Sequence, residues 1–330
     1  MKAALCKSWG EPASLVLEDV PNVPLTEGEV RIAVHAAGIN PADILAIAGK
    51  FQLPPTLPFS PGFEAAGEVI ESNSSDVKVG SRVLAVLPYF KDGNPHFGAF
   101  AQELVALATN VLAIPDNIDF SEAAALPVIY GTAHIALGYR AQLQPGETLL
   151  VTGGTGGTGS AAIQVGKKMG ATVIATTSGA QKLKVLQDMG AHAIDYKTEN
   201  VAEKVLEITD GKGANVIFET VGGDLFAATT QCIAFEGRIL PIGAASGKIP
   251  EVSILVPLVK NCSIVGTDFA AYTLRDIERV RNSLREILSW YNEGFIKPVP
   301  PRTMPLEKAA EALAAVANAQ AGGKLVLNMK

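Results

Sequence analysis

The sequence is poor in the residues that hold metals or cross-link chains. Its three cysteines are widely spaced and form no C-x-x-C pair: Cys6, Cys232 and Cys262. They support neither a disulfide framework nor a cysteine-based zinc site, so we expect them to be buried structural residues. Its four histidines are equally scattered, show no H-E-x-x-H spacing and are expected to be structural: His35, His96, His134 and His192.

Basic clusters and long apolar runs are also missing. The net charge is −6, and no stretch concentrates lysine and arginine, which argues against a nucleic acid as the main partner. No apolar run is long enough to cross a membrane, and the sequence passes from Met1 into strand-like residues without a cleavable signal. We therefore expect a cytoplasmic protein with no membrane partner.

Length and composition indicate a globular protein of two domains. The chain has 330 residues, of which 48% are hydrophobic and 18% are charged. Such a chain can bury sizeable cores and is not disordered, and its length suits two domains better than one.

The stretch 148–170, TLLVTGGTGGTGSAAIQVGKKMG, is the most informative part of the sequence. An apolar run too short for a helix is followed by Gly154, Gly156 and Gly159 in G-x-G-x-x-G order, and then by helical spacing. The first glycine permits a tight turn, the second lets a pyrophosphate approach, and the third lets the helix pack close to the strand. N–H groups at the helix start attract phosphate. A flexible Gly/Thr-rich loop is the alternative, but this setting favours a dinucleotide site formed by Gly154, Thr155, Gly156, Gly157 and Thr158.

The end of the next strand indicates which dinucleotide binds. An NAD site usually has Asp or Glu there, about 20 residues after the glycines, to bind the adenosine ribose. Here the predicted strand 172–176 is followed by Thr177, Ser178 and then Lys182, without a carboxylate. Because hydroxyls and an ammonium suit a 2′-phosphate, we predict NADPH rather than NADH. Alternatively, Lys182 is a solvated residue on a helix that Ser178 caps.

The middle of the chain alternates short apolar strands with helices. The predicted strands are 148–152, 172–176, 192–195, 215–219, 238–242 and 263–267. This alternation predicts an α/β fold with a doubly wound parallel sheet. Gly170 and Gly190 stand where helices should end, and Asn200 with Glu203 forms a plausible cap for a helix over 201–209.

The flanking regions have a different character. Residues 1–118 place many prolines and glycines between β-rich segments, which indicates an irregular β domain with strands at 29–36, 65–71 and 82–87. After the central region we predict helices over 276–292 and 307–319 and a final strand over 324–329. A single terminal strand needs a partner, and the N-terminal β domain is the nearest candidate.

Several further motifs occur in order along the whole chain. They include GINPAD at 38–43, PFSPGFEAAG at 58–67, the glycine turn, ETVGG at 219–223 and GKLVL at 323–327. Together these motifs resemble the zinc-independent quinone oxidoreductases of the medium-chain dehydrogenase/reductase superfamily, the zeta-crystallin-like group. The resemblance implies a Rossmann NADPH-binding domain at 120–269 and a GroES-like catalytic domain made of 1–119 and 270–330, with a cleft where NADPH and substrate meet.

The resemblance also implies roles for residues outside the glycine turn. Lys182 and Tyr196 match positions that grip the 2′-phosphate, beside Thr177 and Ser178; for Tyr196, packing on the sheet edge is the alternative. Thr132 matches a threonine near the nicotinamide, and Phe269 matches a segment whose backbone meets the carboxamide. The loop along the cofactor comprises Gly243, Ala244, Ala245 and Ser246, and Val221 of the ETVGG motif completes the predicted cofactor residues.

The residues at the zinc positions of this superfamily do not suit a metal. Zinc-dependent relatives have a cysteine at the position of Asn40 and a histidine at the position of Phe63, just before Glu64. A catalytic zinc needs about three protein ligands, and the sequence offers no matching set. We therefore predict no metal, and an acceptor that is already electrophilic rather than a simple alcohol.

Three residues are predicted to act at the acceptor. Asn40 is expected to be an amide donor to the substrate or the nicotinamide ribose, and Tyr130 a phenolic proton donor. Asp43 either orients this group of residues or is a turn residue that caps the short helix after Pro41.

The predicted acceptor pocket is more apolar than in some relatives. Leu45 and Ile47 stand where some family members have tyrosine and arginine. The loop before Gly98 is expected to shape the rest of the pocket with Tyr89, Phe90, His96 and Phe97.

The leading hypothesis is an NADPH-dependent quinone oxidoreductase that works without zinc. An NADPH-dependent enone, 2-alkenal or enoyl-thioester reductase is the second hypothesis, because the hydride geometry is the same. A third is a non-catalytic NADPH-binding protein of the crystallin type, or an RNA binder, against which the acidic charge argues. The family and an exposed sheet edge near 263–268 lead us to expect a homodimer.

Overall fold

The computed structural model describes residues 1–52, 54–88, 98–318 and 321–329. The chain divides into two compact units. Unit 1 comprises Met1–Val128, Phe269–Asn292 and Lys297–Lys330, and unit 2 comprises Ile129–Asp268 and Glu293–Ile296. The four residues predicted to shape the acceptor pocket before Gly98 lie outside the described residues: Tyr89, Phe90, His96 and Phe97.

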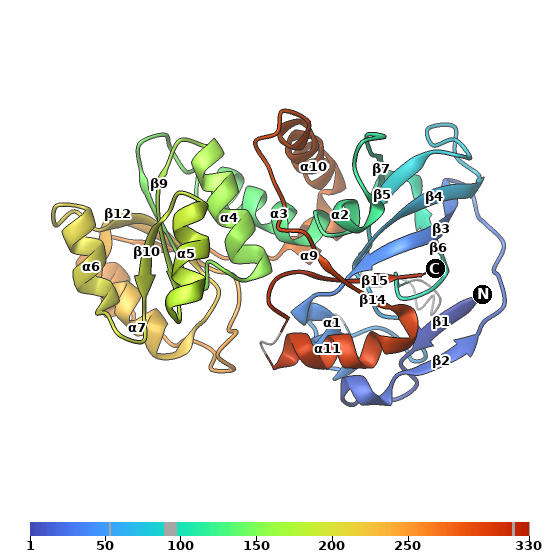
Figure 1. Cartoon of the computed structure of the whole chain (residues 1–330), viewed down its shortest axis with the longest axis horizontal. Helices are drawn as coiled ribbons and strands as arrows, with labels where there is room; N and C mark the ends of the chain where they lie inside the picture. Colours follow the sequence, from blue (N-terminus) through green and yellow to red (C-terminus); the bar gives the residue numbers. More distant parts are fainter. Residues whose placement is uncertain (53, 89–97, 319–320, 330) are drawn as a thin grey trace. The chain divides into compact units, whose positions relative to one another are not determined.

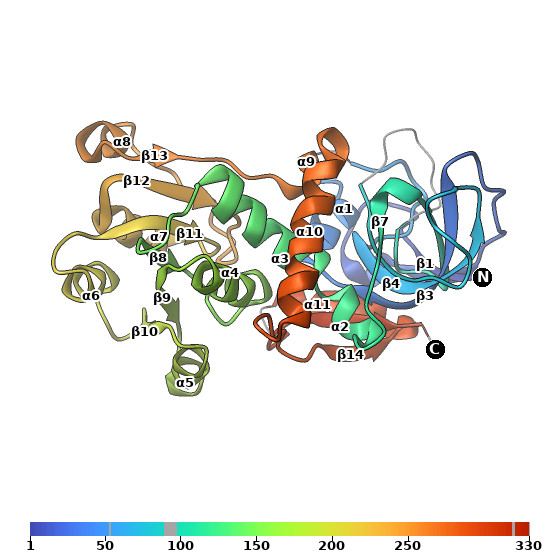
Figure 2. The same cartoon turned by 90° about the horizontal axis from the view of Figure 1, so that it is seen from above.

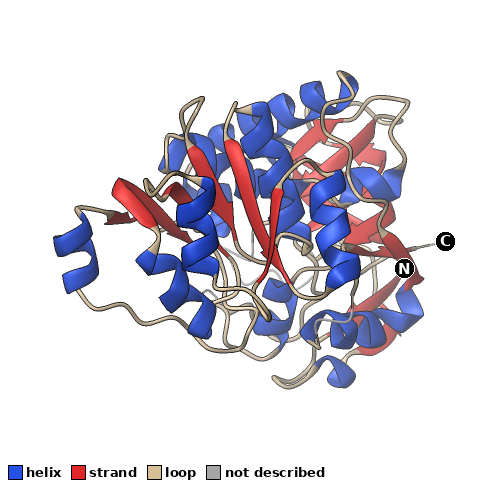
Figure 3. Cartoon of the chain, turned by 60° about the vertical axis from the view of Figure 1, so that its left-hand side comes forward, coloured by secondary structure: helices blue, strands red, loops and turns tan. Residues whose placement is uncertain are grey.

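Unit 2 contains a six-stranded sheet whose strands are all parallel. Its strand order is β10-β9-β8-β11-β12-β13. The bounds are β8 (Thr148–Val151), β9 (Thr172–Thr177), β10 (His192–Asp195), β11 (Ala214–Glu219), β12 (Ile233–Pro241) and β13 (Ser263–Ile264). Figure 3 shows helices on both faces of this sheet, which confirms the predicted doubly wound fold. Only β12 begins clearly earlier than predicted, where its register with β11 shifts between Ala214 and Val216.

The helices of this unit begin and end largely as the sequence predicts (Figure 1). Asn200 caps α6, since its Oδ1 accepts hydrogen bonds from the backbone N–H groups of Ala202 and Glu203 at 3.1 and 3.3 Å. Gly170 and Gly190 follow the ends of α4 and α5 with positive φ angles, which glycine adopts without strain. The bounds are α3 (Pro127–His134), α4 (Gly157–Lys168), α5 (Ala180–Asp188), α6 (Val201–Ile208), α7 (Gly223–Gln231) and α8 (Leu255–Lys260), and a π-helical segment, Ile135–Arg140, continues α3.

The predicted cap of α5 is wrong. The N-cap residue is Gly179 rather than Ser178, and no side chain caps the helix. Gly179 has a φ of +88°, which favours glycine over residues with a side chain. The N–H of Gly179 donates to Asp195 Oδ2, at the end of the neighbouring strand, at 3.0 Å.

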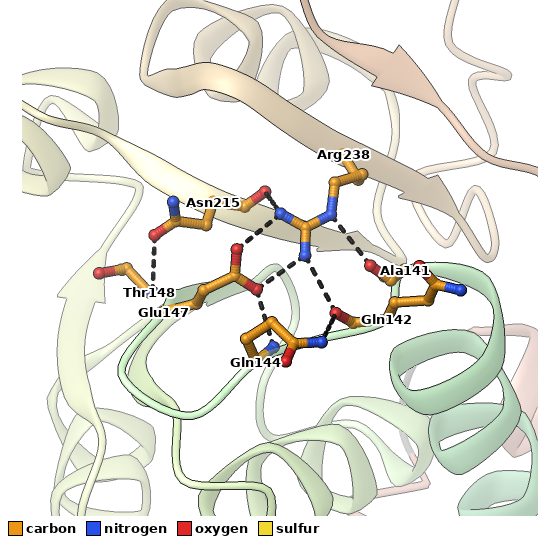
Figure 4. Close-up of polar contacts among 7 residues, drawn as sticks. All are labelled: Ala141, Gln142, Gln144, Glu147, Thr148, Asn215 and Arg238. Carbon is orange, nitrogen blue, oxygen red and sulfur yellow. Dashed lines mark hydrogen bonds and ion pairs between the residues drawn. The ribbon is translucent and has the colours of Figure 1, made fainter.

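A polar cluster joins the amino ends of β8 and β11 to β12 (Figure 4). Arg238 binds Glu147 in a bidentate pair, with Nη1 2.8 Å from Oε1 and Nη2 2.7 Å from Oε2. Its Nε also donates to the carbonyl oxygen of Ala141 at 3.0 Å. The guanidinium donates these hydrogen bonds to the Glu147 carboxylate and so lowers the pKa of Glu147. The cluster therefore fixes the loop that leads into β8.

Unit 1 is built on a mainly antiparallel seven-stranded sheet. Six strands follow the order β14-β15-β3-β4-β5-β7, and β6 also pairs with β3. The bounds are β3 (Glu29–Gly38), β4 (Glu64–Ser72), β5 (Arg82–Val86), β6 (Glu103–Leu107), β7 (Val111–Ala113), β14 (Arg302–Pro305) and β15 (Leu325–Asn328), and a separate pair is formed by β1 (Lys2–Leu5) and β2 (Val16–Asp19). The terminal strand β15 pairs with β3, which confirms that it joins the N-terminal β region.

Unit 1 also contains five helices among the described residues. They are α1 (Pro41–Ile47), α2 (Phe120–Ala124), α9 (Phe269–Arg275), α10 (Ile277–Asn292) and α11 (Ala309–Ala317), with short 3₁₀ turns at Pro12–Ser14, Ala108–Asn110 and Leu306–Lys308. Figure 2 shows α9 leading directly into α10, which covers the predicted helix 276–292. All three cysteines are unpaired and buried, as expected from their spacing.

Candidate functional site

The glycine turn between β8 and α4 is as tight as the motif requires. A Cβ added to Gly159 would overlap the carbonyl oxygen of Gly153. A Cβ on Gly154 would lie 2.9 Å from Leu186 Cδ2 and 3.0 Å from Ala175 Cβ. At Gly159 the turn and the helix therefore approach so closely that only glycine fits, and at Gly154 the surrounding side chains leave little space for a Cβ.

The start of α4 suits the pyrophosphate of a dinucleotide. This helix has twelve residues, and its N-cap, Gly156, is exposed and has no side chain to block an anion. The first N–H groups of a helix have no acceptor within the helix and carry the positive end of its dipole. Gly157 and Thr158 of the first turn are half-buried, so the residues of the turn fit the group that the motif implies.

The residues predicted to bind the adenosine end lie together at the carboxyl ends of β9 and β10. The hydroxyls of Thr155 and Thr177 are 3.0 Å apart, and the backbone N–H of Tyr196 donates to the carbonyl oxygen of Thr177 at 3.1 Å. Tyr196 is half-buried against the core beside the edge strand β10. Ser178 is half-buried, and Lys182 is exposed on α5.

One carboxylate in this region escaped the sequence analysis. Asp195 ends β10, which lies beside β9, and it is 7% exposed. Its Oδ2 accepts from Gly179 N–H and its Oδ1 from Lys197 N–H, both at 3.0 Å. The sequence placed no acid at the end of β9, and only the pairing of β9 with β10 brings this one alongside.

Glu219 organises the loop after β11. This residue is fully buried, and its Oε1 accepts from the hydroxyl of Thr152 at 2.9 Å and from the N–H groups of Val221 and Gly222 at 2.8 Å. Burial raises the pKa of its carboxyl.

The predicted cofactor loop after β12 lies beside the loop after β11. Gly243 N–H donates to Glu219 O at 3.2 Å, Ala245 N–H to Thr220 O at 3.0 Å, and Ser246 N–H to Val221 O at 2.9 Å. Val221 and the segment that contains Gly243, Ala244, Ala245 and Ser246 are thus held together by main-chain hydrogen bonds.

Tyr130 and Thr132 both lie on α3. A Cβ added to Gly157 would lie 3.5 Å from Ile129 Cγ2, so this helix passes beside the glycine turn. Tyr130 is 1% exposed, and its phenol oxygen accepts from Gln164 Nε2 on α4 at 3.0 Å. Burial raises the pKa of Tyr130, which keeps the phenol protonated.

Asn40 and Asp43 lie in unit 1, at the start of α1. Asn40 is 3% exposed and Asp43 is fully buried. Asp43 Oδ2 accepts from the backbone N–H of Asn40 at 2.7 Å, and its Oδ1 accepts from Gly62 N–H at 3.0 Å. These bonds are those of the capping alternative, and they also tie the start of α1 to the loop before β4.

The side chain of Asn40 joins a buried ion pair that the sequence analysis did not identify. Its Nδ2 donates to Glu64 Oε1 at 2.8 Å, and its Oδ1 accepts from Lys324 Nζ at 2.6 Å. Lys324 Nζ is also 2.5 Å from Glu64 Oε1. The GKLVL and GFE motifs contain these residues, but their contact depends on the pairing of three strands from opposite ends of the chain.

The remaining predicted site residues are divided between the units. Phe269 is 9% exposed and begins α9 in unit 1, whereas the other predicted cofactor residues belong to unit 2. Leu45 is 45% exposed, but Ile47 is fully buried in the core of unit 1. Of the two apolar replacements, only Leu45 has surface to offer a ligand.

Within the described residues, no group of three or more His, Cys, Asp or Glu side chains is arranged to hold a metal ion. None of the described helices combines the length and the apolar character needed to cross a membrane.

Known proteins resemble the chain along its whole length. Residues 26–116 match the family described as the alcohol dehydrogenase GroES-like domain, and residues 157–290 match the family described as zinc-binding dehydrogenase. The quinone oxidoreductase-like protein 2 homolog of Nematostella vectensis is 41% identical over 100% of this chain and 89% of its own length.

Two solved structures illustrate the similarity of fold. Quinone oxidoreductase of Escherichia coli, complexed with NADPH, is 26% identical with a TM-score of 0.89, and the match covers 100% of both chains. The CurK enoyl reductase is 26% identical with a TM-score of 0.85 and covers 100% of this chain and 99% of its own. These matches confirm the predicted pairing of a GroES-like domain with a Rossmann-type domain. The chain is therefore an oxidoreductase with a nicotinamide cofactor, and it belongs to the quinone oxidoreductase-like proteins of the medium-chain dehydrogenase/reductase superfamily.

Proposed function

We propose that the protein is an NADPH-dependent quinone oxidoreductase that works without zinc. The observation that carries the proposal is the environment of Asn40, whose Oδ1 accepts from the Lys324 ammonium at 2.6 Å. This residue stands where zinc-dependent relatives have a cysteine ligand. The similarity to quinone oxidoreductases supports the choice of acceptor.

The donor set does not fit the zinc that one matching family's description implies. A zinc site is built from Cys, His and carboxylate ligands, whereas this position offers an amide and a phenylalanine, Asn40 and Phe63. The remaining acid, Glu64, is already bound by an ammonium, and Phe63 is 5% exposed in the core of unit 1. The proposed reaction therefore involves no metal ion.

The proposed cofactor is NADPH. Thr177, Ser178, Lys182 and Tyr196 offer hydroxyls and one ammonium at the carboxyl ends of β9 and β10, where a 2′-phosphate needs donors. The carboxylate of Asp195 is engaged by two backbone N–H groups. These contacts support a preference for the phosphorylated cofactor.

Hydride transfer to a quinone requires no covalent bond between the protein and the substrate. The nicotinamide cofactor supplies a hydride, and a quinone accepts it at a conjugated carbon while charge develops on oxygen. In our proposal Asn40 donates from Nδ2 to the substrate or the nicotinamide ribose, and Asp43 holds its backbone through the hydrogen bond at 2.7 Å. Glu219 and the segment from Gly243 to Ser246 hold the loops along the cofactor.

Tyr130 is the proposed proton donor. Because burial raises the pKa of Tyr130, the phenol carries its proton throughout the neutral range. Replacing Tyr130 with phenylalanine is expected to lower kcat at least tenfold with the fold intact. If kcat is unchanged in Y130F, water or a ribose hydroxyl delivers the proton instead.

An enone, 2-alkenal or enoyl-thioester reductase is the second candidate. It uses the same hydride geometry, and the similarity to CurK enoyl reductase favours it. Leu45 is the one described side chain of the predicted apolar pocket with a large exposed surface, and it suits either acceptor. The third candidate, an NADPH-binding protein without turnover, rests on the crystallin-like resemblance alone.

One set of assays separates the three candidates. NADPH oxidation is measured with 9,10-phenanthrenequinone and 1,4-benzoquinone, side by side with trans-2-hexenal and crotonyl-CoA. We expect the highest kcat/KM with a quinone. Higher values with the enal or the thioester would favour the second candidate, and tight NADPH binding without oxidation by any acceptor would favour the third.

The proposed assembly is a homodimer formed through the edge of the parallel sheet. β13 is an edge strand, and a set of exposed apolar side chains lies in the sequence before it: Ile249, Ile254, Leu255, Leu258 and Val259. Unpaired edge groups and apolar surface favour pairing with a second copy. Sedimentation analysis of the protein and of its I254E/L258E variant tests this assembly. A cytoplasmic location stays a prediction.

A further inference from the structure

Lys324 is a buried cation with a complete set of acceptors. Its side chain is 5% exposed, and Nζ is 2.9 Å from Ile39 O, 2.6 Å from Asn40 Oδ1 and 2.5 Å from Glu64 Oε1. An ammonium has three donors, and each finds an oxygen here. Lysine is almost never buried without partners, so these three oxygens are what allows the Lys324 ammonium to be buried in unit 1.

The sheet of unit 1 assembles the ion pair from distant parts of the sequence. Gly38 of β3 is paired with Glu64 of β4 on one side and with Val326 of β15 on the other. A Cβ on Gly38 would overlap Glu64 Oε1, so only glycine leaves room for the carboxylate. The second carboxylate oxygen accepts from Val128 N–H at 2.7 Å. Both oxygens of Glu64 are therefore held in place.

This pair leaves the Asn40 amide one orientation. Lys324 offers only donors and faces Oδ1, whereas the Glu64 carboxylate offers only acceptors and faces Nδ2. In the flipped amide, an NH₂ group would face the ammonium and a carbonyl oxygen would face the carboxylate, and both contacts would be repulsive. One Nδ2 hydrogen binds Glu64, which leaves the second as the donor with a fixed direction.

The Lys324 ammonium places a positive charge beside Asn40, at the position of a zinc ligand in zinc-dependent relatives. The residue that corresponds to a cysteine ligand in zinc-dependent relatives here accepts a hydrogen bond from a cation of the chain itself. Lys324 and Glu64 together are neutral, so the pair is buried without net charge.

We propose that Lys324 and Glu64 are positioning residues for Asn40, with the Lys324 ammonium as a resident cation where zinc-dependent relatives build their metal site. This inference rests on the proposed function, in which the Asn40 amide is the donor at the reacting groups. The ion pair aims that donor before the substrate binds.

The first test compares two matched double variants. K324M/E64Q removes both charges of the pair in unit 1, and R238M/E147Q removes both charges of the pair in unit 2. Neither leaves a lone buried charge, so both are expected to fold, with melting temperatures within several degrees of each other. In K324M/E64Q the glutamine amide tolerates either orientation of Asn40, and we expect kcat with 9,10-phenanthrenequinone to fall at least tenfold. The Kd for NADPH should change less than twofold, and R238M/E147Q should keep the kcat of the parent protein.

A purely structural role predicts a different result. If the Lys324–Glu64 pair only stabilises unit 1, folded K324M/E64Q will have the kcat of the parent protein, and the inference is wrong. An equal loss of kcat in both double variants would also overturn it.

The second test does not depend on turnover. Side-chain amide resonances are recorded with selectively ¹⁵N-asparagine-labelled protein and assigned with N40D. We expect two well-separated, slowly exchanging Asn40 amide protons in the parent protein, and averaged or faster-exchanging protons in K324M/E64Q. Unchanged Asn40 resonances in K324M/E64Q would overturn the inference. If none of the acceptors supports NADPH oxidation by the parent protein, the proposed function is wrong. The test of the amide orientation is still valid in that case, because it does not require turnover.

Discussion

An ion pair between distant segments lies in each unit of the molecule, Lys324–Glu64 in unit 1 and Arg238–Glu147 in unit 2, and the two pairs are built differently. In unit 1, Lys324 and Glu64 have side chains that are 5% and 0% exposed. In unit 2, Arg238 and Glu147 are each 19% exposed. The first pair holds the side-chain amide of Asn40, whereas the second holds backbone carbonyls such as that of Ala141.

The chemistry of the two cations suits the pairs to different roles. The planar fork of Arg238 makes two parallel bonds to a carboxylate and clamps a loop at the amino ends of the parallel strands (Figure 4). Most of the predicted cofactor residues of this unit follow the carboxyl ends of the parallel strands. Lys324 is a compact charge with three donors, which suits a small buried site made of separate oxygens. One pair therefore fixes the backbone, and the other contacts the side chain of Asn40, which we propose to act at the acceptor.

Breaking the buried pair is expected to have the largest effect. K324M leaves the Glu64 carboxylate buried without its cation and the Asn40 oxygen without its donor. The free energy of unfolding should fall by about 3–5 kcal/mol. Urea unfolding of K324M and of K324M/E64Q measures this loss and its recovery in the double variant. A loss in K324M no larger than that of R238M would remove the distinction between the two pairs.

Breaking the pair in unit 2 is expected to lower the free energy of unfolding by a smaller amount. In R238M, Glu147 keeps its hydrogen bond from Gln144 N–H and remains open to water. We expect the free energy of unfolding to fall by about 1–2 kcal/mol, because solvent screens the remaining charge. The kcat and the KM for NADPH should not change, which steady-state kinetics checks. A change in KM would mean that the amino ends of the strands influence the cofactor site.

Cofactor choice should depend on unit 2 alone. S178D/K182A places a carboxylate and removes an ammonium where a 2′-phosphate is expected. The ratio of kcat/KM for NADPH to that for NADH should fall at least tenfold and favour NADH, which corresponds to about 1.4 kcal/mol. K324M/E64Q serves as the control and should keep the original ratio. An unchanged ratio in S178D/K182A would contradict the assignment of these residues.

The pH dependence of stability gives the smallest predicted effect. Arg238 lowers the pKa of Glu147 in the folded protein, so the stabilisation by this carboxylate is present above its unfolded pKa. It is lost as the pH falls through the lower folded pKa. The difference in free energy of unfolding between the parent protein and E147Q should be largest near neutral pH and shrink below about pH 4.5. A difference that grows on acidification would have the wrong sign.

Local patterns predicted much of the fold. The glycine turn, the alternation of strands and helices, and the Asn200 cap each depend on residues close in sequence, and each appears where expected. The wrong prediction at Ser178 is also local. A serine just before a helix predicts an N-cap, but the N-cap residue of α5 is the next residue, Gly179. The role of Asp195 depends on which strands are neighbours.

The ion pair around Asn40 could not be predicted from spacing. Lys324 and Glu64 are 260 residues apart, and they meet only because β15 and β4 pair with the same strand. The sequence singled out Asn40 through the resemblance and through the missing zinc ligands. It gave no sign that an ammonium binds the same amide, since a lysine near a chain terminus is ordinarily a solvated residue.

The most direct test of the account is quinone reduction by protein whose metal content is known. The protein is treated with a chelator, its zinc is measured by mass spectrometry, and NADPH oxidation with 9,10-phenanthrenequinone is followed. We predict full kcat at a zinc content far below one ion per chain, with no gain on adding zinc. Activity that disappears with the chelator and returns with zinc would contradict the account.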